Sequence, residues 1–233
     1  MVEICIVLPA YLEAENLKLI LPKIHLNLKH ISHDILVIDT MQPMDNTEEV
    51  CLHNNAKYIP RTGGNFYGDA IRTGFKKADS KFTVVMDADG SHNPQDINRF
   101  YEEIKKGGCD LVIGSRYCEG GKTDNPAVLR GMSFLLNCVY RIVFGLKIKD
   151  VSDSFRMYKT EQVQNLNLTC NNFDIVEEIL IRLSISKKHY VMKEVPIEFS
   201  KRAAGNSKRN LFKFILSYIT TMIKLLKIKY SCK

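Results

Sequence analysis

The chain has 233 residues, 45% of them hydrophobic and 25% charged, with a net charge of +7. This composition is that of one globular domain with a packed core, and it excludes long disordered tracts, collagen-like repeats and a polytopic membrane protein. The basic excess lies in residues 187–233, which hold twelve Lys and Arg against two Glu. It predicts contact with phosphates, on a nucleotide, a nucleic acid or an anionic membrane.

Cysteine spacing and the N-terminal residues indicate the compartment. None of the seven cysteines forms a CxxC pair, which excludes a zinc ribbon and predicts reduced thiols. The N-terminus lacks the basic and apolar regions of a signal peptide, so we expect a cytoplasmic protein. The longest uncharged apolar stretch near the C-terminus, residues 214–223, is ten residues long, and we therefore expect no transmembrane segment.

Strand-like and helix-like segments alternate through the first half of the chain. Short β-branched runs predict strands, and apolar residues at helical spacing predict helices. In chain order these are a strand at Ile4–Leu8, a helix at Glu15–Lys29, strands at Ile35–Asp39 and Ala56–Pro60, a helix at Tyr67–Ala78, a strand at Phe82–Met86, a helix at Pro94–Lys106 and a strand at Leu111–Gly114.

The second half continues the alternation and adds a polar loop before a last helix. Its expected elements are a helix at Ala127–Phe144, a strand at Val151–Tyr158, a helix at Phe173–Ser186, extended chain at His189–Phe199, a loop at Ser200–Asn210 and a helix at Leu211–Lys229. The pattern predicts an α/β fold with a mostly parallel central sheet flanked by helices. Without repeats or linkers, we expect one domain at residues 1–208 and a basic amphipathic helix at 209–233.

Two aspartates follow the clearest strand. Asp87 and Asp89 are two residues apart, so in extended backbone both carboxylates project to the same side. Such a pair suits Mg²⁺ or Mn²⁺, with a nucleotide diphosphate completing the ligands. Taken alone, this pattern more often indicates a solvated acidic turn than a metal site. Its place at a strand end favours a ligand site, because ligands of open α/β sheets bind at the carboxyl ends of strands.

Other side chains at strand ends extend this candidate site. Tyr11 and Glu13 follow the first strand and Asp39 ends the second, where each could face a base or ribose or cap a turn. His92 is either a metal ligand or an exposed loop histidine, and the second reading is favoured. Guanidinium groups suit phosphates, although each arginine singly reads as a surface charge. The arginines in polar surroundings are Arg116, Arg130, Arg156 and Arg202.

Eight segments in this order resemble the inverting glycosyltransferases of family 2, which have a GT-A fold. Among them, the branch of dolichol- and polyprenyl-phosphate mannosyltransferases is the most similar. The segments are IVLPAYLEAENL, VIDT, GNFYGDAIRTGFKKA, VVMDADGSHNPQDI, DLVIGSRY, LRGMSFLLN, DVSDSFRMYK and VPIEFSKRAAGNSK.

The resemblance assigns roles by matching position. It implies that Asp87 and Asp89 are the metal-binding DxD motif and also catalytic, together with Arg116 and Arg130. The residues that it implies for substrate binding are Pro9, Tyr11, Glu13 and Asp39 for the nucleotide, Arg202 and Lys208 for the donor phosphates, and Arg116, Arg130 and Ser133 for an acceptor phosphate. Three places depart from the family pattern: Thr40–Gln42, Gly90 with Ser91, and Ser154 in place of a glycine.

The implied reaction is a metal-dependent inverting displacement that uses Mg²⁺ or Mn²⁺. It moves a hexosyl group, mannose or glucose, from a GDP- or UDP-sugar to a polyprenyl or dolichyl phosphate, an acceptor that is already anionic and needs no strong base. Two alternatives stay open. One is a glycan-extending transferase with a hydroxyl acceptor, and the other is a catalytically weakened nucleotide-sugar-binding protein.

The last helix has two readings. Its apolar residues, with lysines around them, indicate either a helix packed on its own domain or a foot on an anionic membrane. The second reading predicts a peripheral protein at the cytoplasmic face of a membrane. A membrane subunit or a homodimer as partner would be compatible with this reading. Nucleic acid is not expected as a partner, because the basic residues are not interleaved with aromatic ones.

Overall fold

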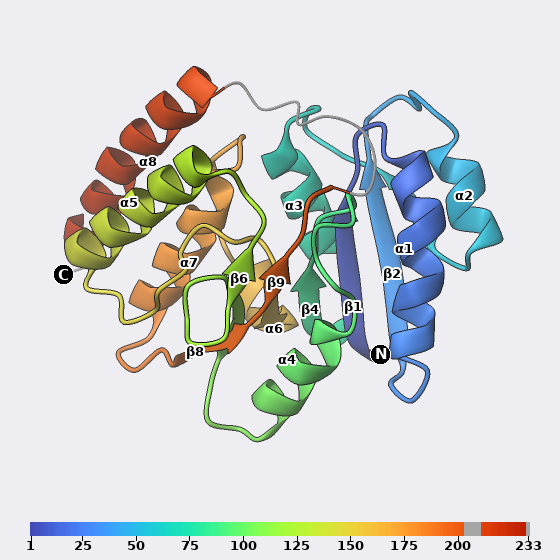
Figure 1. Cartoon of the computed structure of the whole chain (residues 1–233), viewed down its shortest axis with the longest axis horizontal. Helices are drawn as coiled ribbons and strands as arrows, with labels where there is room; N and C mark the ends of the chain where they lie inside the picture. Colours follow the sequence, from blue (N-terminus) through green and yellow to red (C-terminus); the bar gives the residue numbers. More distant parts are fainter. Residues whose placement is uncertain (203–210, 232–233) are drawn as a thin grey trace.

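The computed structural model describes residues 1–202 and the last helix, Leu211–Ser231, in which side chains are described at 218 and 220–230. Its centre is a seven-stranded sheet in the order β3-β2-β1-β4-β7-β5-β8 (Figure 1). All neighbouring strands are parallel except that β7 runs antiparallel to β4 and β5, so the expected mostly parallel sheet is confirmed. The strands are β1 Val2–Pro9, β2 His33–Asp39, β3 Lys57–Pro60, β4 Ser80–Val85, β5 Leu111–Ser115, β7 Arg156–Lys159 and β8 Met192–Pro196.

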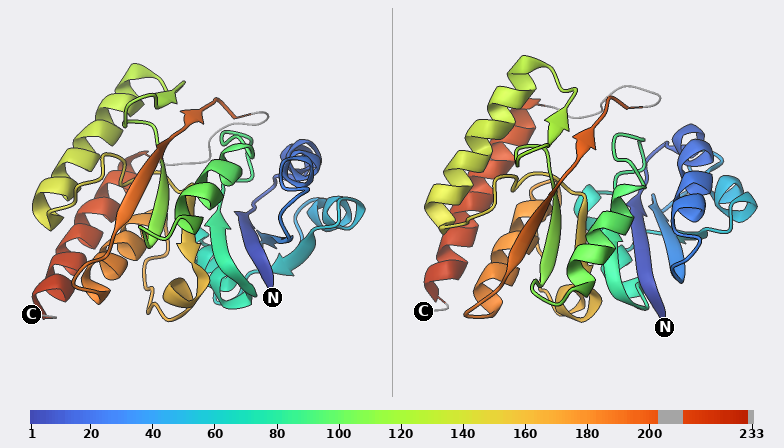
Figure 2. Two further views of the ribbon diagram at one scale, coloured as in Figure 1. Left: turned by 90° about the horizontal axis from the view of Figure 1, so that it is seen from below. Right: turned by 60° about the horizontal axis from the view of Figure 1, so that its bottom comes forward.

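Helices cover both faces of the sheet (Figure 2). One face packs against α1 Ala14–Asn27, α2 Thr47–His53 and α4 Asp96–Lys105. The other packs against α3 Tyr67–Lys77, α5 Ala127–Phe144, α6 Thr160–Gln164, α7 Ile175–Ser186 and α8 Leu211–Ser231. In β1, Ile4 and Ile6 enter the first core while Cys5 and Val7 enter the second. A strand buried on both faces therefore reads as a continuous apolar run.

The strand expected at residues 151–158 was wrong at its start, since β7 begins at Arg156. Carboxylates hold the preceding residues in a turn. Asp150 Oδ1 accepts backbone N–H groups from Ser152 at 3.3 Å and Asp153 at 3.2 Å, and Asp153 Oδ1 accepts from Phe155 at 2.8 Å. These local bonds compete with strand pairing.

The short elements escaped prediction. Neither α2 nor α6 was expected, because five to seven residues carry little periodic signal. A small second sheet pairs β6, Lys122–Thr123, with β9, Glu198–Phe199. The second of these strands falls within the extended chain expected at 189–199.

The cysteines behave as expected. The six that lie in the described ranges are free thiols, and four of them are buried. Burial raises the pKa of both Cys5 and Cys51 to about 12, so these thiols stay protonated and unreactive.

The helix α8 packs on its own domain, beside α5 (Figures 1 and 2). Tyr218, Thr221 and Leu225 are buried, and the Tyr140 hydroxyl donates to the Tyr218 carbonyl at 3.3 Å. By contrast, only Asn137, Tyr140 and Phe144 of α5 are buried. In the described ranges, α5 is the one helix whose length and composition would allow it to cross a membrane. The expectation of no transmembrane segment was drawn from residues 214–223 and did not consider α5.

Candidate functional site

A cavity of about 210 Å³ opens at the carboxyl ends of β1 and β4. It brings together six of the residues selected from the sequence, which come from three separate parts of the chain. These are Pro9, Tyr11, Glu13, Asp87, Asp89 and Arg202. The cavity lies where parallel strands end, as expected for ligand sites of α/β sheets.

The two aspartates reach this cavity from a turn rather than from extended backbone. The strand β4 ends at Val85, residues 88 and 89 form a turn, and Gly90 takes φ +81° just after the pair. Glycine adopts this left-handed conformation without strain. The premise of an extended Asp87–Asp89 segment was therefore wrong, although both residues do line one cavity.

Two hydroxyl groups hold the carboxylate of Asp87. Its Oδ1 accepts a hydrogen bond from Ser154 Oγ at 3.0 Å and a longer one from the Tyr67 hydroxyl at 3.4 Å. Ser154 stands where the family pattern has a glycine, which could not make this bond. Donors of this kind fix the orientation of a carboxylate that binds a metal.

Asp89 is held by its neighbour and faces an arginine. Its Oδ1 accepts from the backbone N–H of Ser91 at 3.0 Å and from the Ser91 hydroxyl at 2.6 Å. Its Oδ2 lies 3.6 Å from Arg202 Nε, and Arg202 also pairs with Glu13. One guanidinium therefore lies between two carboxylates in the cavity.

The residues present fit a hard divalent cation. Asp87 and Asp89 supply carboxylate oxygens, the donor type that Mg²⁺ and Mn²⁺ prefer, and Arg202 shows that a cation is already favoured beside Asp89. No group of three or more His, Cys, Asp or Glu suited to a metal occurs in the described ranges. The remaining ligands of a metal here would come from the bound substrate and water.

His92 is not the exposed loop histidine that the sequence favoured. Its side chain is fully buried. The ring stacks on Phe155 with centroids 4.7 Å apart and meets the edge of Phe199 at 5.2 Å. Its Nε2 lies 3.2 Å from Asp153 Oδ1.

Arg116 is also buried, which corrects its reading as a surface charge. Its Nε and Nη2 donate to the two carboxylate oxygens of Asp150, both at 2.8 Å, and Nε lies 3.1 Å from Asp153 Oδ2. Burial alone would lower the pKa of Arg116, but the two aspartates raise it. For Asp153 the effects are reversed: burial alone would raise its pKa, but Arg116 and His92 lower it to about 2.

Sequence reasoning missed both aspartates of this ion-pair cluster. Their signal is two acids three residues apart, one just before and one within the segment expected to be a strand, since a buried acid needs a buried cation.

The residues expected to meet an acceptor phosphate lie outside the cavity. Ser133, on α5, lies 3.4 Å from Arg116 Nη2 and 3.0 Å from Ser152 Oγ. Arg130, one turn earlier on α5, is exposed. The structure thus joins Arg116 to Ser133, and the acceptor role of all three residues stays a prediction. Lys208 lies outside the described residues.

Arg156 and Asp39 differ from the surroundings that we expected. Arg156 is fully buried and donates to the carbonyls of Val176 at 2.9 Å and Val151 at 2.7 Å, which is a structural role. Asp39 does not line the cavity and is only 1% exposed. Burial raises the pKa of Asp39 despite the opposing charge of Arg61. Its nucleotide-binding role stays a prediction.

Arg61, Tyr67 and Phe173 also line the cavity and were not anticipated. The Arg61 guanidinium donates to the carbonyls of Ala10, Asp39 at 2.9 Å and Phe66 at 3.0 Å, and so ties the ends of β1 and β2 to the loop before α3. Tyr67 and Phe173 stack with centroids 4.3 Å apart and form an aromatic wall. The sequence does not indicate this wall, because its two residues are distant along the chain and meet only in the folded structure.

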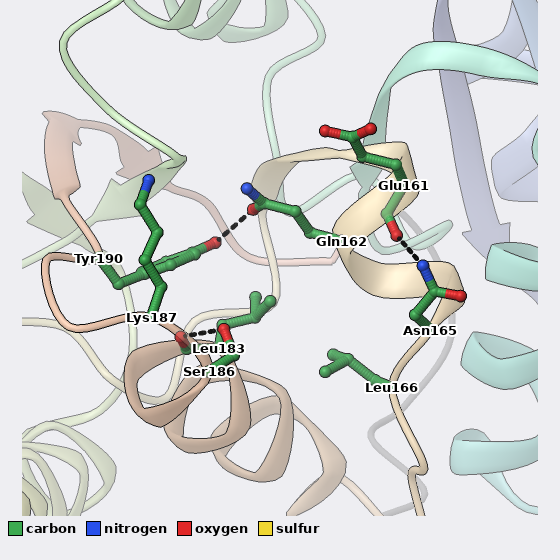
Figure 3. Close-up of a pocket in the computed structure, with 8 residues that line it drawn as sticks. All are labelled: Glu161, Gln162, Asn165, Leu166, Leu183, Ser186, Lys187 and Tyr190. Atoms are coloured by element: carbon green, nitrogen blue, oxygen red, sulfur yellow. Dashed lines mark hydrogen bonds between the residues drawn. The ribbon is translucent and has the colours of Figure 1, made fainter.

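A second cavity, of about 370 Å³, lies between α6 and α7 (Figure 3). Several of its polar groups are paired with protein partners: the Tyr190 hydroxyl donates to Gln162 at 3.1 Å, and Lys187 pairs with Asp110 at 3.0 Å. None of the site residues expected from the sequence lines it. We therefore place the chemistry in the first cavity.

Comparisons with known proteins show the family of the chain. Residues 5–166 match the family described as Glycosyl transferase family 2. The chain is 36% identical over 233 residues to a dolichol-phosphate mannosyltransferase of Pyrococcus furiosus, a match that covers 97% of this chain and 64% of that protein. The chain thus spans less than two thirds of the length of this relative.

Two further matches cover most of both partners. A polyprenol monophosphomannose synthase of Mycolicibacterium smegmatis is 31% identical over 214 residues, 87% of this chain and 79% of that protein. Glucosyl-3-phosphoglycerate synthase from Mycobacterium tuberculosis, solved with Mn²⁺ and UDP-glucose, superposes with a TM-score of 0.75 at 16% identity, over 97% of this chain and 79% of that one. At this identity the likeness concerns the fold, which is GT-A.

Proposed function

The chain belongs to glycosyl transferase family 2, and from this membership we propose that it transfers a hexosyl group from a nucleotide-diphosphate sugar to a polyprenyl phosphate. Mannose is the first candidate sugar and glucose the second, because the two curated relatives are named for mannose transfer and the structural neighbour was solved with UDP-glucose. The donor is a GDP- or UDP-sugar.

One observation carries this proposal. The cavity at the ends of β1 and β4 holds Glu13, Asp87, Asp89 and Arg202 together. Paired carboxylates and a facing guanidinium suit a metal and the diphosphate that it would bind. The stacked Tyr67 and Phe173 offer an apolar wall beside them.

The residues divide the work of a single displacement. An oxygen of the acceptor phosphate attacks the anomeric carbon of the sugar, and the bond from that carbon to the donor diphosphate breaks. Arg202 neutralises the charge that develops on the departing diphosphate. The acceptor arrives as an anion, so the described site needs no strong general base.

Asp87 and Asp89 would hold the divalent cation, Mg²⁺ or Mn²⁺. When bound, it would act as a Lewis acid on the leaving diphosphate. Ser154 and Ser91 keep the two carboxylates oriented for this task.

Arg116, Arg130 and Ser133 are our proposed acceptor-phosphate residues. Asp150 and Asp153 hold Arg116, so it would contribute a fixed positive charge rather than a mobile side chain. Arg130 on the exposed side of α5 would make the first contact with a phosphate arriving from a membrane.

The surface of α5 supports a peripheral position on a membrane. Its outer face exposes large apolar side chains, and Arg130 lies among them while Lys147 and Lys149 follow the helix. Such a face can insert at the surface of an anionic bilayer, with cations at the headgroups. The exposed apolar residues are Val128, Leu129, Phe134, Leu135 and Ile142.

Transfer of radiolabel tests this function. The chain is incubated with labelled GDP-mannose, GDP-glucose or UDP-glucose, Mn²⁺ and polyprenyl phosphate in detergent, beside an Asp89→Ala variant. We expect label in the organic-extractable lipid from one donor, lost by at least a hundredfold in the variant. Label that stays in the water phase with every donor would refute the lipid acceptor, and label in an added glycan would establish a hydroxyl acceptor.

A further inference from the structure

His92 touches the turn that carries the two cavity aspartates. Its Nδ1 lies 3.3 Å from the backbone nitrogen of Asp87, which donates a hydrogen bond to it. That bond requires a lone pair on Nδ1, so the ring hydrogen belongs on Nε2. Nε2 points to Asp153, whose Oδ1 lies 3.2 Å away. One ring thus accepts a hydrogen bond from the aspartate turn and places its other nitrogen within ion-pair distance of a buried carboxylate.

Asp153 continues the chain of contacts to α5. Its Oδ2 lies 3.1 Å from Arg116 Nε, and Arg116 Nη2 lies 3.4 Å from the Ser133 hydroxyl. Polar contacts therefore run without a break from the backbone of Asp87 to Ser133. Under the proposed function, the first end belongs to the donor site and the second to the acceptor site.

Two aromatic rings pack against the buried ring of His92. Phe155 stacks on the ring, and Phe199 packs against it in a T-shaped arrangement. Phe199 begins the segment that leads to Arg202, and the next residue, Ser200, donates its backbone N–H to the Ser91 carbonyl at 3.0 Å. A close-packed ring transmits displacements between its neighbours.

We propose, on the basis of the function proposed above, that His92 is a positioning residue that sets the donor-side aspartates relative to the acceptor-side Arg116. It touches neither substrate. Nδ1 acts on the donor side through the backbone of Asp87, and Nε2 acts on the acceptor side through Asp153.

Two variants separate these arms. In His92→Asn the amide can reach the position of Nδ1, so an acceptor for the Asp87 N–H remains and the contact with Asp153 is lost. In His92→Gln the longer side chain can reach the position of Nε2, so a donor to Asp153 remains and the acceptor for Asp87 is lost. Both variants lose the ring that stacks on Phe155, so damage from packing is common to them.

The two readouts are the dissociation constant of the Mn²⁺ complex of GDP or UDP, whichever the unaltered chain binds, and the KM for polyprenyl phosphate. We expect His92→Gln to weaken nucleotide binding about tenfold with little change in the acceptor KM. For His92→Asn we expect the acceptor KM to rise about tenfold with nucleotide binding retained. His53→Asn, at an exposed histidine on α2, is the matched control, and thermal unfolding shows that each variant folds.

The proposal is overturned if both variants change the nucleotide dissociation constant and the acceptor KM equally, because His92 would then act only through packing. It is also overturned if neither quantity changes in either variant. Failure of the proposed function is visible separately, because the unaltered chain would then bind nucleotide without transferring sugar to the lipid. Even in that case, nucleotide affinity must still differ between the Gln and Asn variants for the positioning role to stand.

Discussion

Arg202 Nε lies 3.6 Å from Asp89 Oδ2, so the positive charge of this guanidinium lies beside the second aspartate of the cavity. The same guanidinium pairs with Glu13. Arg202 thus competes with a divalent cation for Asp89, yet it would attract the diphosphate that arrives with the metal.

This double role predicts effects of opposite sign for Arg202→Met. We expect the affinity for Mn²⁺ alone to rise several-fold, because a competing charge has gone. We expect the affinity for the Mn²⁺–nucleotide complex to fall about tenfold, since a hydrogen bond to a charged group contributes about 1.5–3 kcal/mol. Titration calorimetry measures both, with Lys106→Met as a control that removes an exposed charge. A loss of affinity for the metal alone would show that Arg202 does not compete.

A second prediction concerns Glu177, which is fully buried on α7. Burial raises its pKa from 4.5 to about 8, with Asp174 adding to the shift and Arg156 opposing it. The folded chain therefore keeps the proton that the unfolded chain loses above pH 4.5, and stability falls as the pH rises toward 8. The slope is at most about 1.4 kcal/mol per pH unit.

Glu177→Gln should remove this part of the pH dependence. Urea unfolding at pH 5, 6.5 and 8 measures it, with the exposed Glu48→Gln as the matched control. The free-energy difference between the Gln variant and the unaltered chain should shift in favour of the variant with increasing pH. A difference that is constant across the three values would show that Glu177 ionises normally in the folded protein.

A third prediction concerns the outer face of α5, where Leu135 is 65% and Ile142 is 82% exposed. They lie two turns apart and share a face of the helix. Replacing both with Ser should weaken binding to vesicles containing half phosphatidylglycerol by tenfold or more, since burying one large apolar side chain contributes about 1.5–3 kcal/mol.

Co-sedimentation with these vesicles measures the binding. Leu52→Ser is the matched control, because this leucine is 72% exposed on α2, which covers the opposite face of the sheet. Nucleotide binding should be unchanged in all the variants. If the control and the double variant lose vesicle binding equally, α5 is not the surface that binds the membrane.

Elements with a strong periodic signal were predictable from the sequence. The apolar run Phe82–Met86 predicted β4, and the aspartates after it line a cavity at the end of that strand. The family resemblance gave Arg202 its expected role at the donor phosphates, and no local pattern would connect this arginine with Asp89.

The buried charges were not predictable, because burial depends on partners that are distant along the chain. Arg116 and Asp150 are 34 residues apart, and neither segment alone indicates that the other will neutralise it. His92 looked exposed for the same reason, since Phe155 and Phe199 cover it from other parts of the chain.

The antiparallel strand β7 also bears on how the chain folds. It pairs with β4 on one side and with β5 on the other, so Met157 lies between Val84 and Val112. Until residues 156–159 leave the ribosome, β4 and β5 each present an unpaired, apolar edge. Contacts between residues this far apart slow folding, and open edges favour association with other chains. The middle of the sheet therefore closes late, and truncation before β7 should yield an insoluble fragment.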